Sequence, residues 1–140
     1  MALPTHLQLQ IVSADRSLVN ERVDEVVIPG ADGYFGVLPG HAPLLALLGA
    51  GELWYRQGQD KHFLAIAFGF AEVLPDRVTI LAQIAEKADE IDIARAEAAK
   101  KRAEERLMSP GMEMDFERAR IAMLKSLIRL QVATRARIRS

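Results

Sequence analysis

Residues 26–44 read VVIPGADGYFGVLPGHAPL, and this stretch decides how the first part of the chain folds. An apolar, β-branched run is followed by closely spaced glycines and prolines, which favour tight turns over one long strand or a helix. Pro29-Gly30 ends the apolar run, and Asp32-Gly33 supplies the residue types of a turn. The stretch therefore predicts short β-strands joined by tight turns.

The sequence on either side of this stretch also has the pattern of short strands. In residues 7–12 (LQLQIV), apolar and polar side chains alternate with the period of a strand that buries one face. Further strands are predicted over residues 52–56, 63–68 and 77–81. Gln57-Gly58-Gln59-Asp60 has the composition of a hairpin turn, and residues 63–68 are apolar on both faces. Connections this short leave no room for crossover helices, so the strands are expected to pair mostly antiparallel in a sandwich or flattened barrel.

The character of the sequence changes near Glu86. Residues 86–107 contain thirteen charged residues and six alanines, and nearly all of these residues favour a helix. Asp89 and Asp92 are suited to cap the start of this helix and to complement its dipole. Ser109-Pro110-Gly111 is predicted to end it.

A second helix is predicted from about Met112 or Asp115. Its apolar residues form two stripes on nearly opposite sides: Phe116, Ala119, Met123, Leu127 and Leu130 on one, and Ile121, Leu124, Ile128 and Val132 on the other. Arg118, Lys125 and Arg129 lie together between the stripes. A helix with two apolar sides is expected to contact two neighbours.

These patterns predict an α+β protein. An N-terminal antiparallel β-sandwich, or flattened barrel, is expected over residues 1–85, and a C-terminal two-helix hairpin over residues 86–140. Because the first helix is rich in alanine, it buries little apolar area, and its docking is expected to be marginal.

Charge is divided unevenly between the two parts. Seven basic residues and no acidic ones follow from Arg118 to Ser140, which leaves 11 basic and 19 acidic residues before Arg118. Residues 118–140 therefore carry about +7 and the preceding residues about −8, a split that usually indicates a partner surface.

No constellation of catalytic residues is found. The chain has no cysteine, which fits a reducing compartment, and its histidines, His6, His41 and His62, lack metal-ligand spacing. Gly49-Ala50-Gly51 is not followed by the remainder of a phosphate-binding loop. We therefore expect no catalytic site, no metal and no required cofactor. No signal peptide is expected, and the apolar runs are far shorter than the roughly 20 residues of a membrane span.

Three segments together carry a family resemblance. They are GVLPGHAP at residues 36–43, GFAEV at residues 69–73 and IDIARA at residues 91–96. With the order of sandwich and then hairpin, the whole chain resembles the epsilon subunit of bacterial and chloroplast F-type ATP synthases. Phe68 departs from the family pattern, because relatives often carry a second glycine beside Gly69.

The resemblance implies a non-catalytic rotor subunit of the central stalk, which couples proton flow to ATP synthesis and regulates ATP hydrolysis. The turn of Ala31, Asp32, Gly33 and Tyr34 would face the membrane c-ring, and His41 would face the gamma subunit. The alternative is that Gly30, Gly33, Gly36 and Gly40 serve only backbone geometry. The extended hairpin would present Arg118, Lys125 and Arg129 to an acidic segment of the catalytic beta subunit.

In some members of this family the hairpin binds ATP as a regulatory ligand. By position, Glu86, Asp92, Arg95 and Arg102 from the first helix and Lys125 and Arg129 from the second would form the site. Lys125 stands where ATP-binding relatives have arginine. A lysine at this position cannot make the bidentate contact with phosphate that an arginine makes. The alternative is that Asp92 and Arg95 form an ordinary surface pair.

The competing function is a scaffold or nucleic-acid-binding module that uses the basic helix. Against it, no aromatic residue follows Phe116 for base stacking. We therefore expect no nucleic-acid partner. A position at the cytoplasmic face of the bacterial plasma membrane, held there by other subunits, is the expected location.

Overall fold

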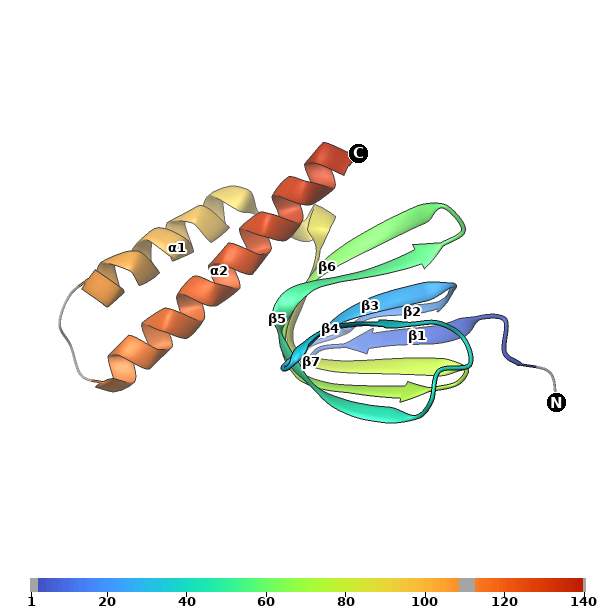
Figure 1. Cartoon of the computed structure of the whole chain (residues 1–140). Coiled ribbons are helices and arrows are strands. Elements are labelled where there is room, and N and C mark those ends of the chain that lie inside the picture. The colour runs from blue at the N-terminus through green and yellow to red at the C-terminus, as the bar shows by residue number, and fades with distance from the viewer. Residues whose placement is uncertain (1–2, 109–112, 140) are drawn as a thin grey trace. The chain divides into compact units, whose positions relative to one another are not determined.

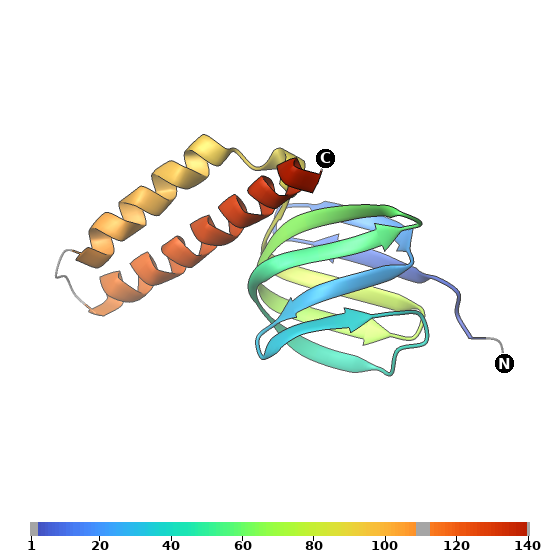
Figure 2. The ribbon, with the colours of Figure 1, turned by 45° about the horizontal axis from the view of Figure 1, so that its top comes forward.

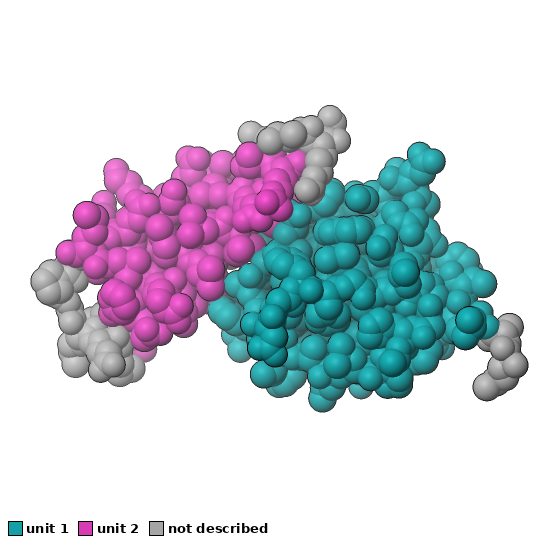
Figure 3. All heavy atoms as spheres, in the orientation of Figure 1, with its two compact units in different colours: residues 1–87 teal, residues 88–140 magenta. Residues whose placement is uncertain are grey.

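The computed structural model describes residues 3–108 and 113–139, so the predicted helix break at Ser109-Pro110-Gly111 lies outside the described residues. Two compact units divide the chain, Met1–Lys87 and Ala88–Ser140 (Figure 3). The strands of the first unit are β1 (Leu7–Val12), β2 (Ser17–Val23), β3 (Glu25–Gly30), β4 (Gly33–Val37), β5 (Leu44–Gln57), β6 (Asp60–Leu74) and β7 (Arg77–Lys87). The second unit holds a 3-10 turn η1 (Ala88–Glu90), α1 (Ile93–Met108) and α2 (Glu113–Arg139) (Figure 1).

The first unit is one seven-stranded sheet folded over on itself. Its strand order is β2-β1-β7-β6-β5-β3-β4, and the strands curve around a common interior (Figure 2). Every pairing in this order is antiparallel except that of β1 with β7, which is parallel. The predicted fold class, a mostly antiparallel sandwich followed by two helices, is confirmed.

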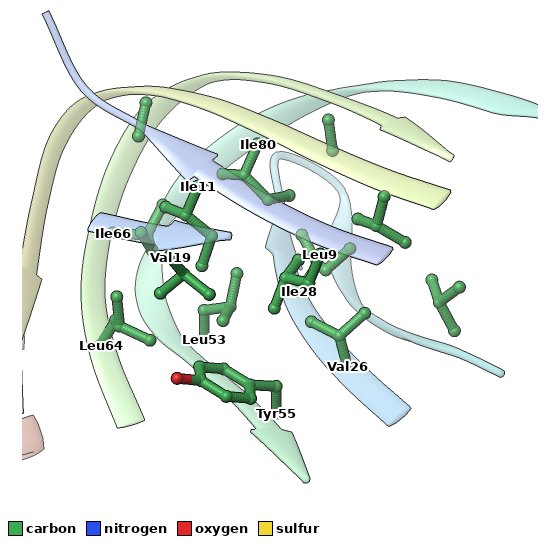
Figure 4. Packing of buried hydrophobic residues seen from close by; sticks show 14 of the residues in the cluster. Leu9, Ile11, Val19, Val26, Ile28, Leu53, Tyr55, Leu64, Ile66 and Ile80 are labelled. Carbon is green, nitrogen blue, oxygen red and sulfur yellow. The ribbon is translucent and has the colours of Figure 1, made fainter. Parts of the chain in front are cut away.

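Apolar side chains from most of the strands fill this interior (Figure 4). They include Leu9, Ile11, Val19, Val26, Ile28, Leu53, Tyr55, Leu64, Ile66 and Ile80. Leu7, Leu9 and Ile11 are fully buried, which confirms the alternation read from residues 7–12. The run predicted to be buried on both faces is also confirmed over Leu64, Ala65, Ile66 and Ala67.

The sheet turns a corner at Phe68 and Gly69 in β6. Both residues have positive φ, 62° for Phe68 and 123° for Gly69. The pairing with β5 passes from Ala67 to Gly69 without a partner for Phe68, and so does the pairing with β7. The register of both ladders is the same before and after Phe68, so no residue is inserted, but the turn reverses which side chains of β6 face inward: Ile66 is buried before it, and after it Ala71 is buried and Phe70 points outward.

Glycine is required at position 69, the second residue of this corner. A Cβ atom at Gly69 would collide with the carbonyl oxygen of Leu81 on β7, in addition to adopting an unfavourable φ. Phe68 carries a Cβ atom, unlike glycine, so its left-handed backbone costs about 1–2 kcal/mol. The departure from the family pattern noted at Phe68 therefore falls on a strained position.

The first helix begins later than the sequence predicts. Glu86 is in β7, opposite Ala65, and α1 begins at Ile93. The ladder between β6 and β7 continues to Lys87, and its backbone hydrogen bonds outweigh the local helix propensity. Asp92 is the N-cap, because its Oδ1 accepts a hydrogen bond of 3.1 Å from the amide of Arg95.

Small residues form the buried side of each helix in the hairpin. On α1 they are Ala96 and Ala103, and on α2 they are Ala119, Ser126 and Ala133, beside which Val132 is a larger buried residue. Within each helix these positions are seven residues apart, close to two turns, and the helices pack against each other. The fully buried positions of α1 are therefore both alanines.

Candidate partner-binding face

The turn predicted to face the c-ring is exposed in the structure. Ala31 and Asp32 connect β3 to β4, Gly33 and Tyr34 begin β4, and all four are exposed. Gly33 has φ 134°, a conformation that favours glycine. The amide of Ala31 donates a hydrogen bond of 2.8 Å to the carbonyl oxygen of Leu47, which fixes the turn beside β5.

Tyr34 combines exposure with a structural contact. Its side chain is 58% exposed, yet its hydroxyl oxygen accepts a 3.0 Å hydrogen bond from the amide of Glu52. A Cβ atom at Gly51 would collide with the Tyr34 hydroxyl, so the phenol lies directly over this glycine. Tyr34 therefore presents one ring face outward while its hydroxyl serves the sheet.

His41 lies in the loop that follows β4. The amide of Gly40 donates a 2.7 Å hydrogen bond to the carbonyl oxygen of Pro75, which ties this loop to the turn between β6 and β7. His41 Nδ1 lies 2.6 Å from the carbonyl oxygen of Ala42. Since a carbonyl oxygen can only accept, Nδ1 carries the proton. The imidazole is half-buried and has a fixed tautomer.

An apolar face that the sequence did not reveal crosses four adjacent strands. Leu47 on β5 lies opposite Phe70 on β6, Phe70 lies opposite Leu81 on β7, and Leu81 lies opposite Val12 on β1. The exposed fractions are 60% for Leu47, 50% for Phe70 and 52% for Leu81, and Val12 is half-buried. These four residues are called the apolar face below. Their row ends beside the exposed turn, through the bond from Ala31 to Leu47.

The signal for the apolar face was present but obscured. Leu44–Leu48 and Phe63–Ala71 are the longest apolar runs, and their outward residues could not be separated from their inward ones. The positive φ angles at Phe68 and Gly69 shift the alternation by one residue, so a constant period assigns Phe70 to the wrong side of the strand.

The basic residues singled out in the hairpin have different exposures. Arg118 on α2 is exposed, whereas Lys125 and Arg129, one turn apart, are half-buried. On α1, Arg95 and Arg102 are exposed and lie two turns apart on one side. Asp92 uses Oδ1 as a helix cap, and Glu86 belongs to β7 and not to the first helix, as described above.

Over residues 3–108 and 113–139, the structure holds no group of three or more histidine or acidic side chains arranged to bind a metal ion. None of the helices in this part of the chain combines the length and the apolar character of a membrane span.

Two family models match the chain. The β-sandwich domain of the ATP synthase delta/epsilon chain matches residues 6–88, and the long α-helix domain of the same chain matches residues 89–134. The ATP synthase epsilon chain of Syntrophobacter fumaroxidans is 50% identical over 91% of this chain and 95% of its own length. That of Solibacter usitatus is 46% identical over 94% of this chain and 98% of its own length.

The fold agrees with these relationships. A chain in a cryo-EM structure of the Euglena gracilis mitochondrial ATP synthase, comprising OSCP, F1 and the c-ring, aligns with a TM-score of 0.83 and 28% identity. The alignment covers 96% of this chain and 84% of that one. Both family models and the full-length relatives point the same way: the chain belongs to the ATP synthase epsilon chains, which are non-catalytic subunits of the ATP synthase complex.

Proposed function

We propose that the chain is a rotor subunit of the central stalk, whose sandwich binds the gamma subunit through the apolar face. The observation that carries this proposal is the row of Leu47, Phe70 and Leu81, each at least half exposed and placed side by side on neighbouring strands. A contiguous apolar surface of this kind favours a protein partner, because leaving it in water costs roughly 25 cal/mol for each Å².

The exposed turn of residues 31–34 is proposed to contact the c-ring. It adjoins the apolar face at Leu47, so one end of the sandwich can contact two partners at once. His41, in the loop tied to Pro75, is proposed to belong to the surface that contacts gamma. These contacts would hold the chain at the cytoplasmic face of the bacterial plasma membrane.

The hairpin is proposed to regulate ATP hydrolysis. Its helices pack through small side chains, so the packing gain is limited, and helix propensity and charge pairs such as Lys100–Glu104 at 3.8 Å support α1 without a neighbour. When extended, α2 would present Arg118, Lys125 and Arg129 to an acidic segment of the beta subunit. Several such pairs formed together would inhibit rotation in the direction of hydrolysis.

ATP is proposed as the ligand that stabilises the folded hairpin. Arg95 and Arg102 on α1, with Lys125 and Arg129 on α2, supply cations suited to a polyphosphate. Asp92 is available to ribose or adenine only through Oδ2, because Oδ1 caps the helix. A ligand at ten times its dissociation constant would add about 1.4 kcal/mol to the folded state.

Truncation of the hairpin tests the regulatory role. An ATP synthase reconstituted with the chain ended after Lys87 should assemble normally and hydrolyse ATP faster than the complete enzyme. A full-length variant with Arg118, Lys125 and Arg129 all changed to Gln is the matched control, because it keeps both helices. It should reproduce the increase. Unchanged hydrolysis in both enzymes would exclude the proposed brake.

A further inference from the structure

Glu72 is an acidic residue placed next to the apolar face. It lies in β6 two residues beyond Phe70, so both side chains project from the same side of the sheet. Its cross-strand neighbours are Leu45 on β5, which is 71% exposed, and Thr79 on β7. The carboxylate is exposed and is therefore flanked by Leu45 and Phe70 on the surface proposed to bind gamma.

Among the described residues of the sandwich, none forms an ion pair with the carboxylate of Glu72. None of the side-chain hydrogen bonds or ion pairs among the described residues includes it. Arg77 is a basic residue on the same side of the sheet, opposite Leu74 and two ladder pairs beyond Glu72 and Thr79. No ion pair joins Arg77 to Glu72 in the described part of the chain, although ladder neighbours of this kind can reach each other.

Covering the apolar face has a consequence for this carboxylate. A partner that contacts both Phe70 and Leu45 removes water from the group between them. Burial of a carboxylate without a counter-ion costs several kcal/mol, which would offset much of the gain from the apolar contacts. The complex avoids this cost only if a cation faces the carboxylate.

We propose that Glu72 is the specificity-determining charge of this interface, and that the gamma subunit presents a lysine or arginine to it. This inference rests on the proposed binding of gamma to the apolar face. The apolar row supplies non-directional attraction, whereas a charge pair at one point of the face fixes the orientation of the partner. A surface lacking a cation at that point would be rejected.

The test is the dissociation constant of the full chain and the gamma subunit of its own complex, measured over a range of salt concentrations. Glu72→Gln removes the charge and Glu72→Lys reverses it. Asp60→Asn and Asp60→Lys are the matched controls, because Asp60 is an exposed acid at the far end of the same strand. We expect Glu72→Gln to weaken binding about tenfold or more, Glu72→Lys to weaken it further, and both Asp60 variants to bind as the parent does.

Two results would overturn the proposal. One is a Glu72→Gln variant that binds gamma as tightly as the parent, which would mean that the carboxylate remains hydrated. The other is an Arg77→Gln variant with the same loss as Glu72→Gln and no added loss in the double variant, which would make Arg77 the counter-ion. The Leu47→Asp variant distinguishes a failure of this inference from a failure of the proposed binding of gamma to the apolar face. If Leu47→Asp also leaves gamma binding unchanged, the apolar face itself is not the interface.

Discussion

The hydroxyl of Tyr34 on β4 accepts a 3.0 Å hydrogen bond from the backbone amide of Glu52 on β5. The ladder between β3 and β5 lapses here, passing from the pair Val27–Trp54 to the pair Gly30–Leu48. The Tyr34 hydroxyl therefore supplies the acceptor that the neighbouring strand does not. A residue expected from the sequence to be only a partner contact also completes the sheet.

Tyr34→Phe should lower the free energy of unfolding by about 1 kcal/mol, because the amide of Glu52 loses its acceptor. Chemical denaturation of the full chain measures this. Since the aromatic ring is retained, association with the c-ring in the assembled enzyme should be unchanged. Equal stability of the two proteins would show that the hydrogen bond contributes nothing.

At position 68, a glycine variant should be more stable than an alanine variant, which is the reverse of the usual order in strands. In most strands glycine is less stable than alanine by roughly 0.5–1 kcal/mol. Phe68 has φ 62°, so Phe68→Gly should be more stable than Phe68→Ala by about 1 kcal/mol. Both variants lose the same aromatic ring, so their difference in unfolding free energy isolates the backbone. A more stable alanine variant would refute the left-handed conformation.

The small residues of the hairpin should not tolerate enlargement. Ala103 on α1 is 2% exposed, and Ala103→Leu should destabilise the pairing of α1 with α2 by about 1–3 kcal/mol through overpacking. Ala98 on the same helix is exposed, and Ala98→Leu is the control. Amide hydrogen exchange of the full chain should be faster in α1 for the first variant only. Equal exchange rates in both variants would contradict the assignment of Ala103 to the buried side of α1.

Binding of ATP should depend on the arginines of α1. Titration calorimetry of the full chain with millimolar ATP should give measurable heat, and Arg102→Ala should weaken the binding by about tenfold or more. Arg106→Ala, an exposed arginine one turn further along α1, is the control. An absence of heat with the parent chain would reject ATP as the ligand.

Much of the fold could be predicted because its signals are local. The alternation over residues 7–12, the turn at Asp32-Gly33 and the cap at Asp92 each depend on nearby residues, and the structure has all three. β2 could not be predicted, because three consecutive exposed polar residues, Asn20, Glu21 and Arg22, interrupt the alternating pattern in this edge strand. The end of β7 was also missed, because it depends on pairing with Leu64 over twenty positions away.

The apolar face could not be predicted for the same kind of reason. Leu47, Phe70 and Leu81 become neighbours only through the registers of β5, β6 and β7. The side of the sheet to which successive β6 side chains point also reverses at Phe68 and Gly69, where Gly69 approaches the backbone of Leu81. Sequence patterns report which residues are apolar, but the side of the sheet on which they emerge is decided by tertiary pairing.

The affinity of the full chain for the gamma subunit, compared between Phe70→Asp and Phe116→Asp, tests the central claim most directly. The two phenylalanines are nearly equally exposed, 50% and 51%, but Phe70 lies on the apolar face and Phe116 lies on α2. Phe70→Asp should weaken binding by about a hundredfold, as expected for a central aromatic residue, while Phe116→Asp should bind as the parent does. Undiminished affinity of a folded Phe70→Asp variant would contradict the assignment of this face to gamma.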